Sequence, residues 1–243
     1  MFYYRGWRVM KDFHISATTL PSAKFSVIIP ARNEENNIAA LLDSLLAQNY
    51  PTELFEIIVV DDHSTDRTAA IVRQYKQVQL LRLQEDGINS FKKKAIETGI
   101  GAAKNNWIVC TDADCVVNPG WLLTLSSFIS SENPVFLAAP VSFTPEFTEK
   151  NGRGGLLYMF QALDFLVLQG ITAAAVHSKK HNMCNGANLA YRRDIFFEVG
   201  GFRGIDDIAS GDDLAVLGFD SGANAETGVF RQCVFACGRG RIY

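Results

Sequence analysis

Several sequence features are scarce or missing in this chain of 243 residues, and each absence excludes a class of protein. The five cysteines are odd in number and include no C-x-x-C pair, so neither a disulfide framework nor a zinc ribbon is indicated, and a reducing cytoplasmic compartment is expected. No apolar run reaches the ~18 residues of a membrane span, and no signal peptide opens the chain. The net charge of −3 provides no basic field, so nucleic acid is not an expected partner.

Two common phosphate-binding motifs are also missing. The chain has no G-x-x-x-x-G-K-[ST] loop. The sequence Gly99-Ile100-Gly101 is followed by Ala102-Ala103-Lys104 and does not complete G-x-G-x-x-G. A P-loop enzyme and a Rossmann dehydrogenase are therefore disfavoured.

Short apolar runs alternate with amphipathic segments over the first 140 residues. The runs predict strands at residues 25–30, 55–60, 78–83, 107–111 and 135–143, and the apolar spacing predicts helices at 38–46, 69–75 and 92–103. Strands that alternate with helices indicate an α/β fold with a mostly parallel sheet. With 48% hydrophobic residues the chain can fill the core of one large domain.

Polar clusters follow three of the predicted strands. They are Arg32-Asn33-Glu34, Asp61-Asp62 and Asp112-Ala113-Asp114. Ligands of such sheets bind outside the carboxyl ends of the strands, so we expect the three clusters to meet at one edge.

The acidic clusters suit a divalent cation. Asp112 and Asp114 can reach one hard cation through oxygen ligands, and a nearby lysine run, residues 92–94, can neutralise a diphosphate. Taken singly, Asp-x-Asp is more often a solvated turn and a lysine run a solvated surface. Further along, residues 185–188 form either a close backbone approach to a ligand or a tight turn. One carboxylate of the pair at 212–213 could act as a general base.

The ordered set of these segments resembles glycosyltransferase family 2, the inverting nucleotide-sugar transferases with the GT-A fold. The matching segments are Val27 to Glu35, Val59 to Asp66, Lys92 to Ile96, Thr111 to Asp114, Asn185 to Asn188 and Gly211 to Asp213. The resemblance implies one Rossmann-like GT-A domain with a mostly parallel sheet flanked by helices. A nucleotidylyltransferase is disfavoured, because Arg32-Asn33-Glu34-Glu35 stands where a glycine-rich loop would follow the first strand.

The resemblance also implies site residues. Pro30, Arg32 and Glu34 would line the nucleoside pocket, and Asp62 would meet the uracil edge. Lys92 would approach the diphosphate of the donor. Asp112 and Asp114 would hold Mg²⁺ or Mn²⁺, with Asp114 as the direct ligand and Asp112 also at the donor.

The acceptor side is implied in the same way. Asp213 would take the proton of the acceptor hydroxyl, and the sugar and acceptor pocket would be shaped by Asn185, Gly186, Ala187, Asn188 and Asp212. The donor would be a nucleotide sugar, UDP-linked by expectation, and the acceptor a hydroxyl of a glycan or lipid in cell-envelope synthesis.

The resemblance ends after Asp213. We therefore expect an arm at 1–24, a GT-A domain at 25–217 and an atypical tail at 218–243, and we hypothesise a frameshift or truncation in this tail. A truncated homologue that binds nucleotide sugar without turnover is the alternative function.

Two segments leave membrane contact open. Aromatic and basic residues at positions 2–8 suit a membrane interface at the inner face of the cell membrane, or an arm docked on the domain. The apolar stretch 155–176 predicts a helix that either packs in the core or rests on a bilayer surface, and the core is the favoured interpretation.

Overall fold

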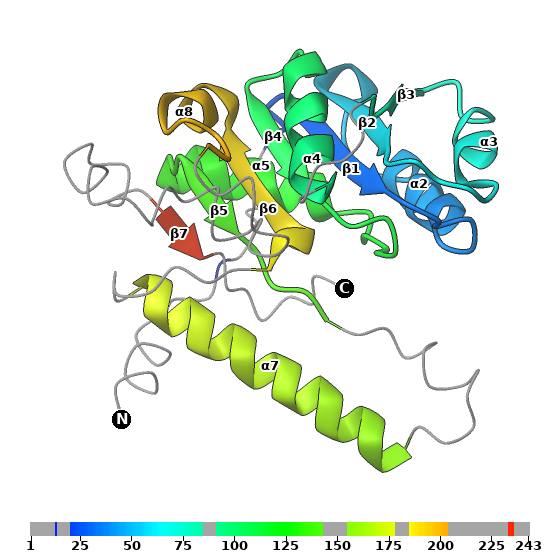
Figure 1. Cartoon of the computed structure of the whole chain (residues 1–243). Helices are drawn as coiled ribbons and strands as arrows, with labels where there is room; N and C mark the ends of the chain where they lie inside the picture. Colours follow the sequence, from blue (N-terminus) through cyan, green and yellow to red (C-terminus); the bar gives the residue numbers. More distant parts are fainter. Residues whose placement is uncertain are drawn as a thin grey trace.

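A computed structural model describes residues 13, 20–84, 91–142, 155–177, 185–203 and 233–235 of the chain (Figure 1). A seven-stranded sheet in the order β3-β2-β1-β4-β6-β5-β7 forms its centre. The strands are β1 (Phe25–Ala31), β2 (Phe55–Asp61), β3 (Val78–Arg82), β4 (Trp107–Cys110), β5 (Phe136–Ala138), β6 (Leu189–Arg192) and β7 (Cys233–Phe235).

The sheet is parallel where the sequence predicts alternating strands and helices. β1 lies between β2 and β4 and pairs in parallel with both, and β3 adds in parallel to β2. β6 departs from this rule because it runs antiparallel to both β4 and β5. β7, which lies within the tail predicted to be atypical, pairs in parallel with β5. The predicted division into arm, domain and tail stays a prediction.

Helices cover both faces of the sheet because the strand side chains alternate between two apolar layers. Val27 and Ile29 of β1 belong to the cluster that includes α2 (Ile38–Leu46), α3 (Thr68–Val72) and α5 (Trp121–Glu132). Ile28 faces the opposite cluster. That cluster includes residues of α4 (Phe91–Ala102) and α8 (Arg193–Glu198).

The N-terminal segment reaches the first of these layers. Phe13 packs edge-on against Phe128 of α5, with ring centroids 4.9 Å apart. Ser22 donates its backbone N–H to Ser126 Oγ at 3.2 Å. Positions 2–8, for which the sequence predicts a membrane interface or docking on the domain, lie outside the described residues.

Several elements differ from the sequence prediction. α3 ends at Val72 rather than Tyr75, and β5 ends at Ala138, two residues before Pro140. Proline cannot donate to a sheet ladder, which accounts for the early end of β5. α5 and α8 were not predicted, because α5 mixes apolar residues with serines and α8 has only six residues.

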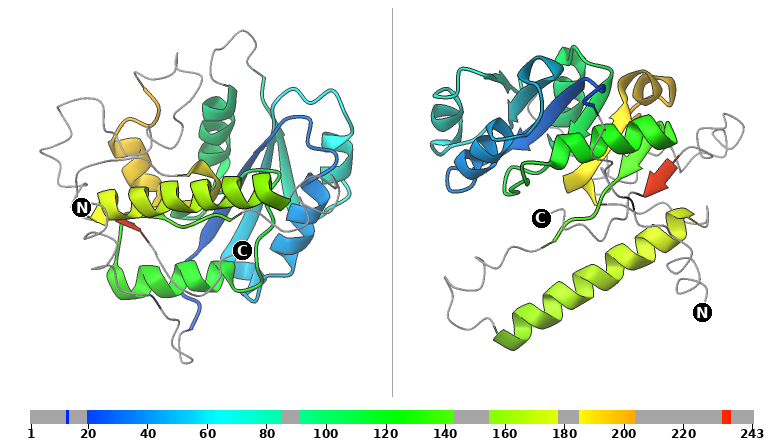
Figure 2. Two further views of the ribbon diagram at one scale, coloured as in Figure 1. Left: turned by 90° about the horizontal axis from the view of Figure 1, so that it is seen from below. Right: turned by 180° about the vertical axis from the view of Figure 1, so that it is seen from behind.

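Helix α7 (Gly155–His177) is long and lies beside β7, the edge strand of the sheet (Figure 2). The favoured interpretation of this segment as core is wrong for its outer face, where large apolar side chains are exposed. Within the described residues, no helix combines the length and the apolarity needed to cross a membrane.

Candidate active site

The polar clusters meet where the strand connections change direction across the sheet. After β1 the chain moves outward to β2 and β3, then returns to the other side of β1 to form β4. The carboxyl ends stay in register, because Asp62 N–H donates to Ala31 O at 2.8 Å and Thr111 N–H donates to Ile28 O at 3.3 Å. Such a switch point is where ligands bind in open α/β sheets.

The loops after β1 and β2 are joined by reciprocal hydrogen bonds. Asn33, at a left-handed φ of 57°, donates its N–H to Ser64 Oγ at 3.0 Å. Its side-chain Oδ1 accepts from the backbone N–H of Thr65 at 2.8 Å. Glu34 donates its N–H to Thr68 Oγ1 at 2.8 Å. These bonds hold the two loops in one geometry.

Asp66 completes this junction. It accepts the backbone N–H of Glu35 at 3.0 Å and the backbone N–H of Thr68 at 2.9 Å. Desolvation raises the pKa of Asp66, but the hydrogen bonds from Thr68 and Glu35 outweigh it and lower the pKa below its usual value. Asp66 therefore stays ionised and keeps the start of α3 tied to the loop after β1.

Four side chains gather at the junction of β1, β2 and α4. The guanidinium of Arg32 lies 3.6 Å from Asp62 Oδ2, and His63 Nδ1 lies 2.9 Å from Asp62 Oδ1. Arg32 Cζ lies 5.3 Å from the centroid of the Phe91 ring. The His63 ring packs edge-on against the same ring, with the two centroids 5.8 Å apart. Asp62 is buried and Arg32 is exposed, so the four side chains form a charged cluster with an aromatic side.

Two of these residues were missed in the sequence. Phe91 directly precedes the lysine run and begins α4, while His63 follows Asp62 at a left-handed φ of 53°. The position of Phe91 beside the lysines offered a signal, but only the packing of α4 against β2 brings it to Arg32.

Two further predicted nucleoside residues lie at the same end of β1. Pro30 is half-buried and opposite Val60 in the β1–β2 register. Glu34 directs its carboxylate to Asn37 Nδ2 at 2.8 Å, and its carbonyl accepts the N–H of Ile38 at 2.9 Å. Glu34 thus also supports the start of α2.

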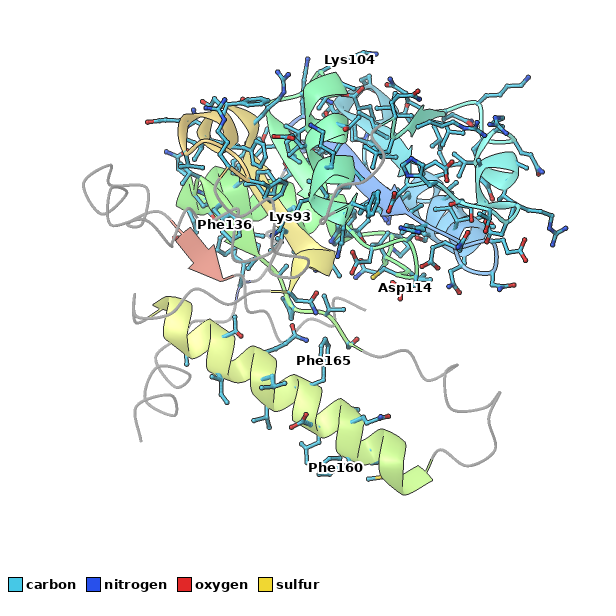
Figure 3. The ribbon with its side chains drawn as sticks, viewed as in Figure 1. Lys93, Lys104, Asp114, Phe136, Phe160 and Phe165 are labelled. Atoms are coloured by element: carbon cyan, nitrogen blue, oxygen red, sulfur yellow. The ribbon has the colours of Figure 1, made fainter. Side chains whose placement is uncertain are left out.

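Lys92 and Asp112 come together across the site. Lys92 Nζ in the first turn of α4 lies 2.9 Å from Asp112 Oδ1, after β4. Both side chains are partly exposed, at 42% and 33%, so both stay within reach of a ligand. Asp114 is exposed two residues further on, at the end of the sheet opposite Lys104 (Figure 3).

The acidic pair creates a negative local field. Burial raises the pKa of the Cys115 thiol to about 11, and the charges of Asp112 and Asp114 contribute to the rise. Among the described residues no group of three or more His, Cys, Asp or Glu side chains is arranged to hold a metal. The two carboxylates fit a hard cation whose remaining ligands come from water or a diphosphate.

The segment 185–188 forms a short 3-10 turn before β6. The side chain of Asn185 accepts from Ala187 N–H at 2.9 Å. The side-chain amide of Asn188 is used within the protein, because its Oδ1 accepts from Trp121 Nε1 at 3.0 Å and its Nδ2 donates to Pro140 O at 2.9 Å. Asn188 therefore braces the turn. Of the remaining predicted residues, Gly186 lies in the turn, whereas Asp212 and Asp213 lie outside the described residues.

Comparison with known families identifies this arrangement. Residues 26–200 match the family described as "Glycosyl transferase family 2". The chain belongs to glycosyl transferase family 2. The match covers β2 to β6 and all of β1 except Phe25, and it includes the clusters after β1, β2 and β4.

Several relatives of this family 2 chain are known. It is 33% identical over 139 residues to poly(ribitol-phosphate) beta-N-acetylglucosaminyltransferase TarS of Staphylococcus aureus (strain Mu50). This match covers 57% of this chain and 23% of that protein. It is 30% identical over 190 residues to glycosyltransferase AglE of Haloferax volcanii, which covers 76% of this chain and 57% of that protein. The chain thus spans less than two thirds of either relative.

Solved structures share the fold. The mannosyltransferase PcManGT of Pyrobaculum calidifontis, in complex with GDP-Man and Mn²⁺, matches with a TM-score of 0.66 and 22% identity. The match covers 89% of this chain and 57% of that chain. S. aureus TarS 1-349 in complex with UDP matches with a TM-score of 0.58 and 25% identity over 80% of this chain and 55% of that chain. The α/β GT-A fold predicted from the sequence is confirmed.

Proposed function

We propose that this family 2 domain transfers a sugar from a nucleotide diphosphate sugar to a hydroxyl acceptor, with inversion at the anomeric carbon. The observation that carries the proposal is the Lys92–Asp112 contact of 2.9 Å, beside the Arg32–Asp62 pair at 3.6 Å. One edge of the sheet thus offers the Lys92 ammonium for a diphosphate, carboxylates for a metal ion, and the buried Asp62 carboxylate for the edge of a nucleobase.

The nucleoside end is assigned to the cluster around Asp62. Arg32 and His63 hold its carboxylate, which can accept a hydrogen bond from the N–H of a pyrimidine ring. Phe91 adds an aromatic surface at the same place. Pro30 and Glu34, at the end of β1 and in the next loop, are assigned to the border of this pocket.

The diphosphate end is assigned to Lys92, Asp112 and Asp114. Mg²⁺ or Mn²⁺ held by the two aspartates would supply neutralisation of the charge that grows on the leaving diphosphate. Lys92 stabilises the same charge directly, and its contact with Asp112 keeps the ammonium aimed at the site.

Transfer itself is assigned to Asp213. Its carboxylate would accept the proton of the acceptor hydroxyl while that oxygen attacks the anomeric carbon and the nucleoside diphosphate departs. General base catalysis of this kind supplies ~10²–10⁴-fold. Asn185, Gly186, Ala187 and Asp212 are assigned to the sugar and acceptor side, with Asn188 as their support.

The donor and acceptor classes are proposed from the relatives. UDP is the first nucleotide to test, since the TarS structures contain UDP or UDP-GlcNAc, and GDP is the second, since PcManGT contains GDP-Man. The relatives include enzymes named for poly(ribitol-phosphate) and for monoglucosyldiacylglycerol. We therefore propose an envelope polymer or glycolipid as the acceptor.

Calorimetric titration with UDP, with and without Mn²⁺, tests the donor site. We expect binding that strengthens with Mn²⁺ and an Asp114→Ala variant that loses this gain. Asp164→Ala, an exposed aspartate on α7, is the matched control and keeps it. No binding of UDP or GDP by the folded chain would refute the donor site.

Turnover separates the proposed enzyme from a protein that only binds the donor. We expect transfer to an added hydroxyl acceptor to stop in Asp213→Asn while UDP binding is retained. Unchanged transfer in that variant would remove Asp213 as the base. Donor binding without transfer to any acceptor of the two classes would favour the binding-only alternative.

A further inference from the structure

One carboxylate at the carboxyl end of β4 has two positive partners. Lys92 Nζ lies 2.9 Å from Asp112 Oδ1, and Asp112 is also one of the two aspartates assigned to Mg²⁺ or Mn²⁺. An ammonium at hydrogen-bond distance and a metal ion coordinated at about 2.1 Å compete for the same oxygen, and their like charges repel each other. Contact of Asp112 with Lys92 therefore weakens its contact with a metal ion.

The second carboxylate of the pair compensates only in part. Asp114 is exposed, and its Oδ1 accepts a weak hydrogen bond from Cys115 Sγ at 3.9 Å. Within the described part of the chain, no third His, Cys, Asp or Glu side chain completes a metal-binding group with the two aspartates. A hard cation takes about six oxygen ligands, so most of them must come from water or from a diphosphate. The protein by itself is therefore a weak ligand for the cation.

The contact between Lys92 and Asp112 can exchange at small cost. The side chain of Lys92 is 42% exposed and that of Asp112 is 33% exposed. Ion pairs in contact with water contribute little to stability, because water screens the charges and the long side chain of lysine loses entropy. A diphosphate carries more negative charge than one carboxylate and is the stronger partner for an ammonium. Lys92 can thus turn to a diphosphate while its backbone stays in the first turn of α4.

The nucleoside side of the site is built differently. The side chain of Asp62 is only 8% exposed, and Arg32 and His63 contact its two carboxylate oxygens. A buried carboxylate keeps such partners, because the loss of one would leave a charge poorly compensated in the protein interior. The site therefore combines a fixed charged cluster at the nucleoside end with an exchangeable ion pair at the diphosphate end.

We propose that Lys92 couples the binding of the metal ion to the binding of the donor. In the chain without donor, Lys92 competes with the cation for Asp112. When the donor binds, Lys92 passes to its diphosphate, and Asp112 turns to the cation that the same diphosphate ligates. Donor and cation therefore strengthen each other's binding, and this coupling is reciprocal. The inference rests on the proposed function, because it requires the donor diphosphate beside Lys92.

Binding of Mn²⁺ alone tests the competition without turnover, and electron paramagnetic resonance measures the free ion. We expect Lys92→Gln to bind Mn²⁺ about three- to tenfold more tightly than the parent, because the competing contact and the repulsion both disappear. Lys92→Arg keeps a charged donor and should stay within about twofold of the parent. Lys104→Gln removes the same charge at the opposite end of the sheet and should also stay within about twofold (Figure 3).

Calorimetric titration with UDP measures the coupling, and circular dichroism checks that each variant is folded. Mn²⁺ should strengthen UDP binding about three- to tenfold less in Lys92→Gln than in the parent, because reciprocity makes the two coupling factors equal.

A Lys92→Gln chain that binds Mn²⁺ no more tightly than the parent overturns the inference, and so does the absence of detectable Mn²⁺ binding by either chain. An equal gain in Lys104→Gln overturns it as well, because the effect would then come from net charge. Failure of the folded parent to bind UDP or GDP, with or without Mn²⁺, refutes the proposed donor site instead.

Discussion

Gly99 in α4 is the position where the addition of one methyl group tests the packing that places Lys92. A Cβ at residue 99 would lie 2.5 Å from Ile28 Cγ2 and 3.3 Å from Val60 Cγ2. Gly101, two residues later in the same helix, has nothing within 4 Å of the equivalent atom. Gly99→Ala and Gly101→Ala thus add the same group to the same helix, and only the first creates a clash.

The expected magnitudes follow from two opposing effects. Alanine improves helix propensity by about 0.5–1 kcal/mol at either site. At residue 99 the methyl sits about 1 Å inside the normal carbon contact distance, against a β-branched side chain with little rotamer freedom. Overpacking of this kind costs about 1–3 kcal/mol. We expect Gly101→Ala to be neutral or slightly stabilising and Gly99→Ala to unfold about 1–3 kcal/mol more easily than Gly101→Ala.

Urea unfolding of both variants and the parent measures this difference. The same difference in thermal unfolding is about 2–4 °C per kcal/mol for a chain of this size. Gly99→Ala should also weaken UDP binding, because α4 must shift outward and carries Lys92 at its other end. Equal stability of the two variants would refute the close approach of α4 to β1.

Three further predictions concern single side chains. Because folding lowers the pKa of Asp66, the ionised carboxylate stabilises the fold above the unfolded pKa of ~3.9, and this stabilisation is lost as the pH falls through the lower folded value. In denaturant titrations between about pH 5 and pH 2, Asp66→Asn should therefore lose less stability than the parent. Asn188→Ala should lower the free energy of unfolding by about 1–3 kcal/mol, since it leaves Trp121 Nε1 buried without its acceptor, and an unchanged urea midpoint would contradict this. Lys92→Gln should weaken UDP binding about 10- to 100-fold in calorimetry, whereas Lys104→Gln, at the opposite end of the sheet (Figure 3), should leave it unchanged.

The sequence determined the alternation of strands and helices on the first half of the chain. The apolar stripe of residues 38–46 and the apolar runs at 55–60 and 107–111 correspond to α2, β2 and β4. Local periodicity predicts such elements because the apolar residues of a buried face recur about every 3.6 residues in a helix and every second residue in a strand. It also predicted that the polar clusters meet, since parallel strands bring their carboxyl ends to one edge.

Other features depend on contacts between distant segments, which no local pattern encodes. The antiparallel β6 joins β4 and β5 across long sequence separations, and Phe91 reaches Arg32 only through the packing of α4. Asn188 has a ligand-like sequence context, yet its amide is bonded to Trp121 and Pro140.

For α7 the sequence favoured core over a bilayer surface, whereas the structure exposes most of its large apolar side chains. An apolar helix has the same sequence whether its outer face is covered or not, because hydrophobicity records which side chains avoid water and not what lies beside them. In the structure Gln169, Ala173 and Ala174 of α7 are buried, whereas most of the large apolar side chains of the same helix are exposed. The sequence therefore determined the strands, the helices and the edge at which the site forms, while the tertiary structure decided which side chains meet there and which apolar face remains exposed.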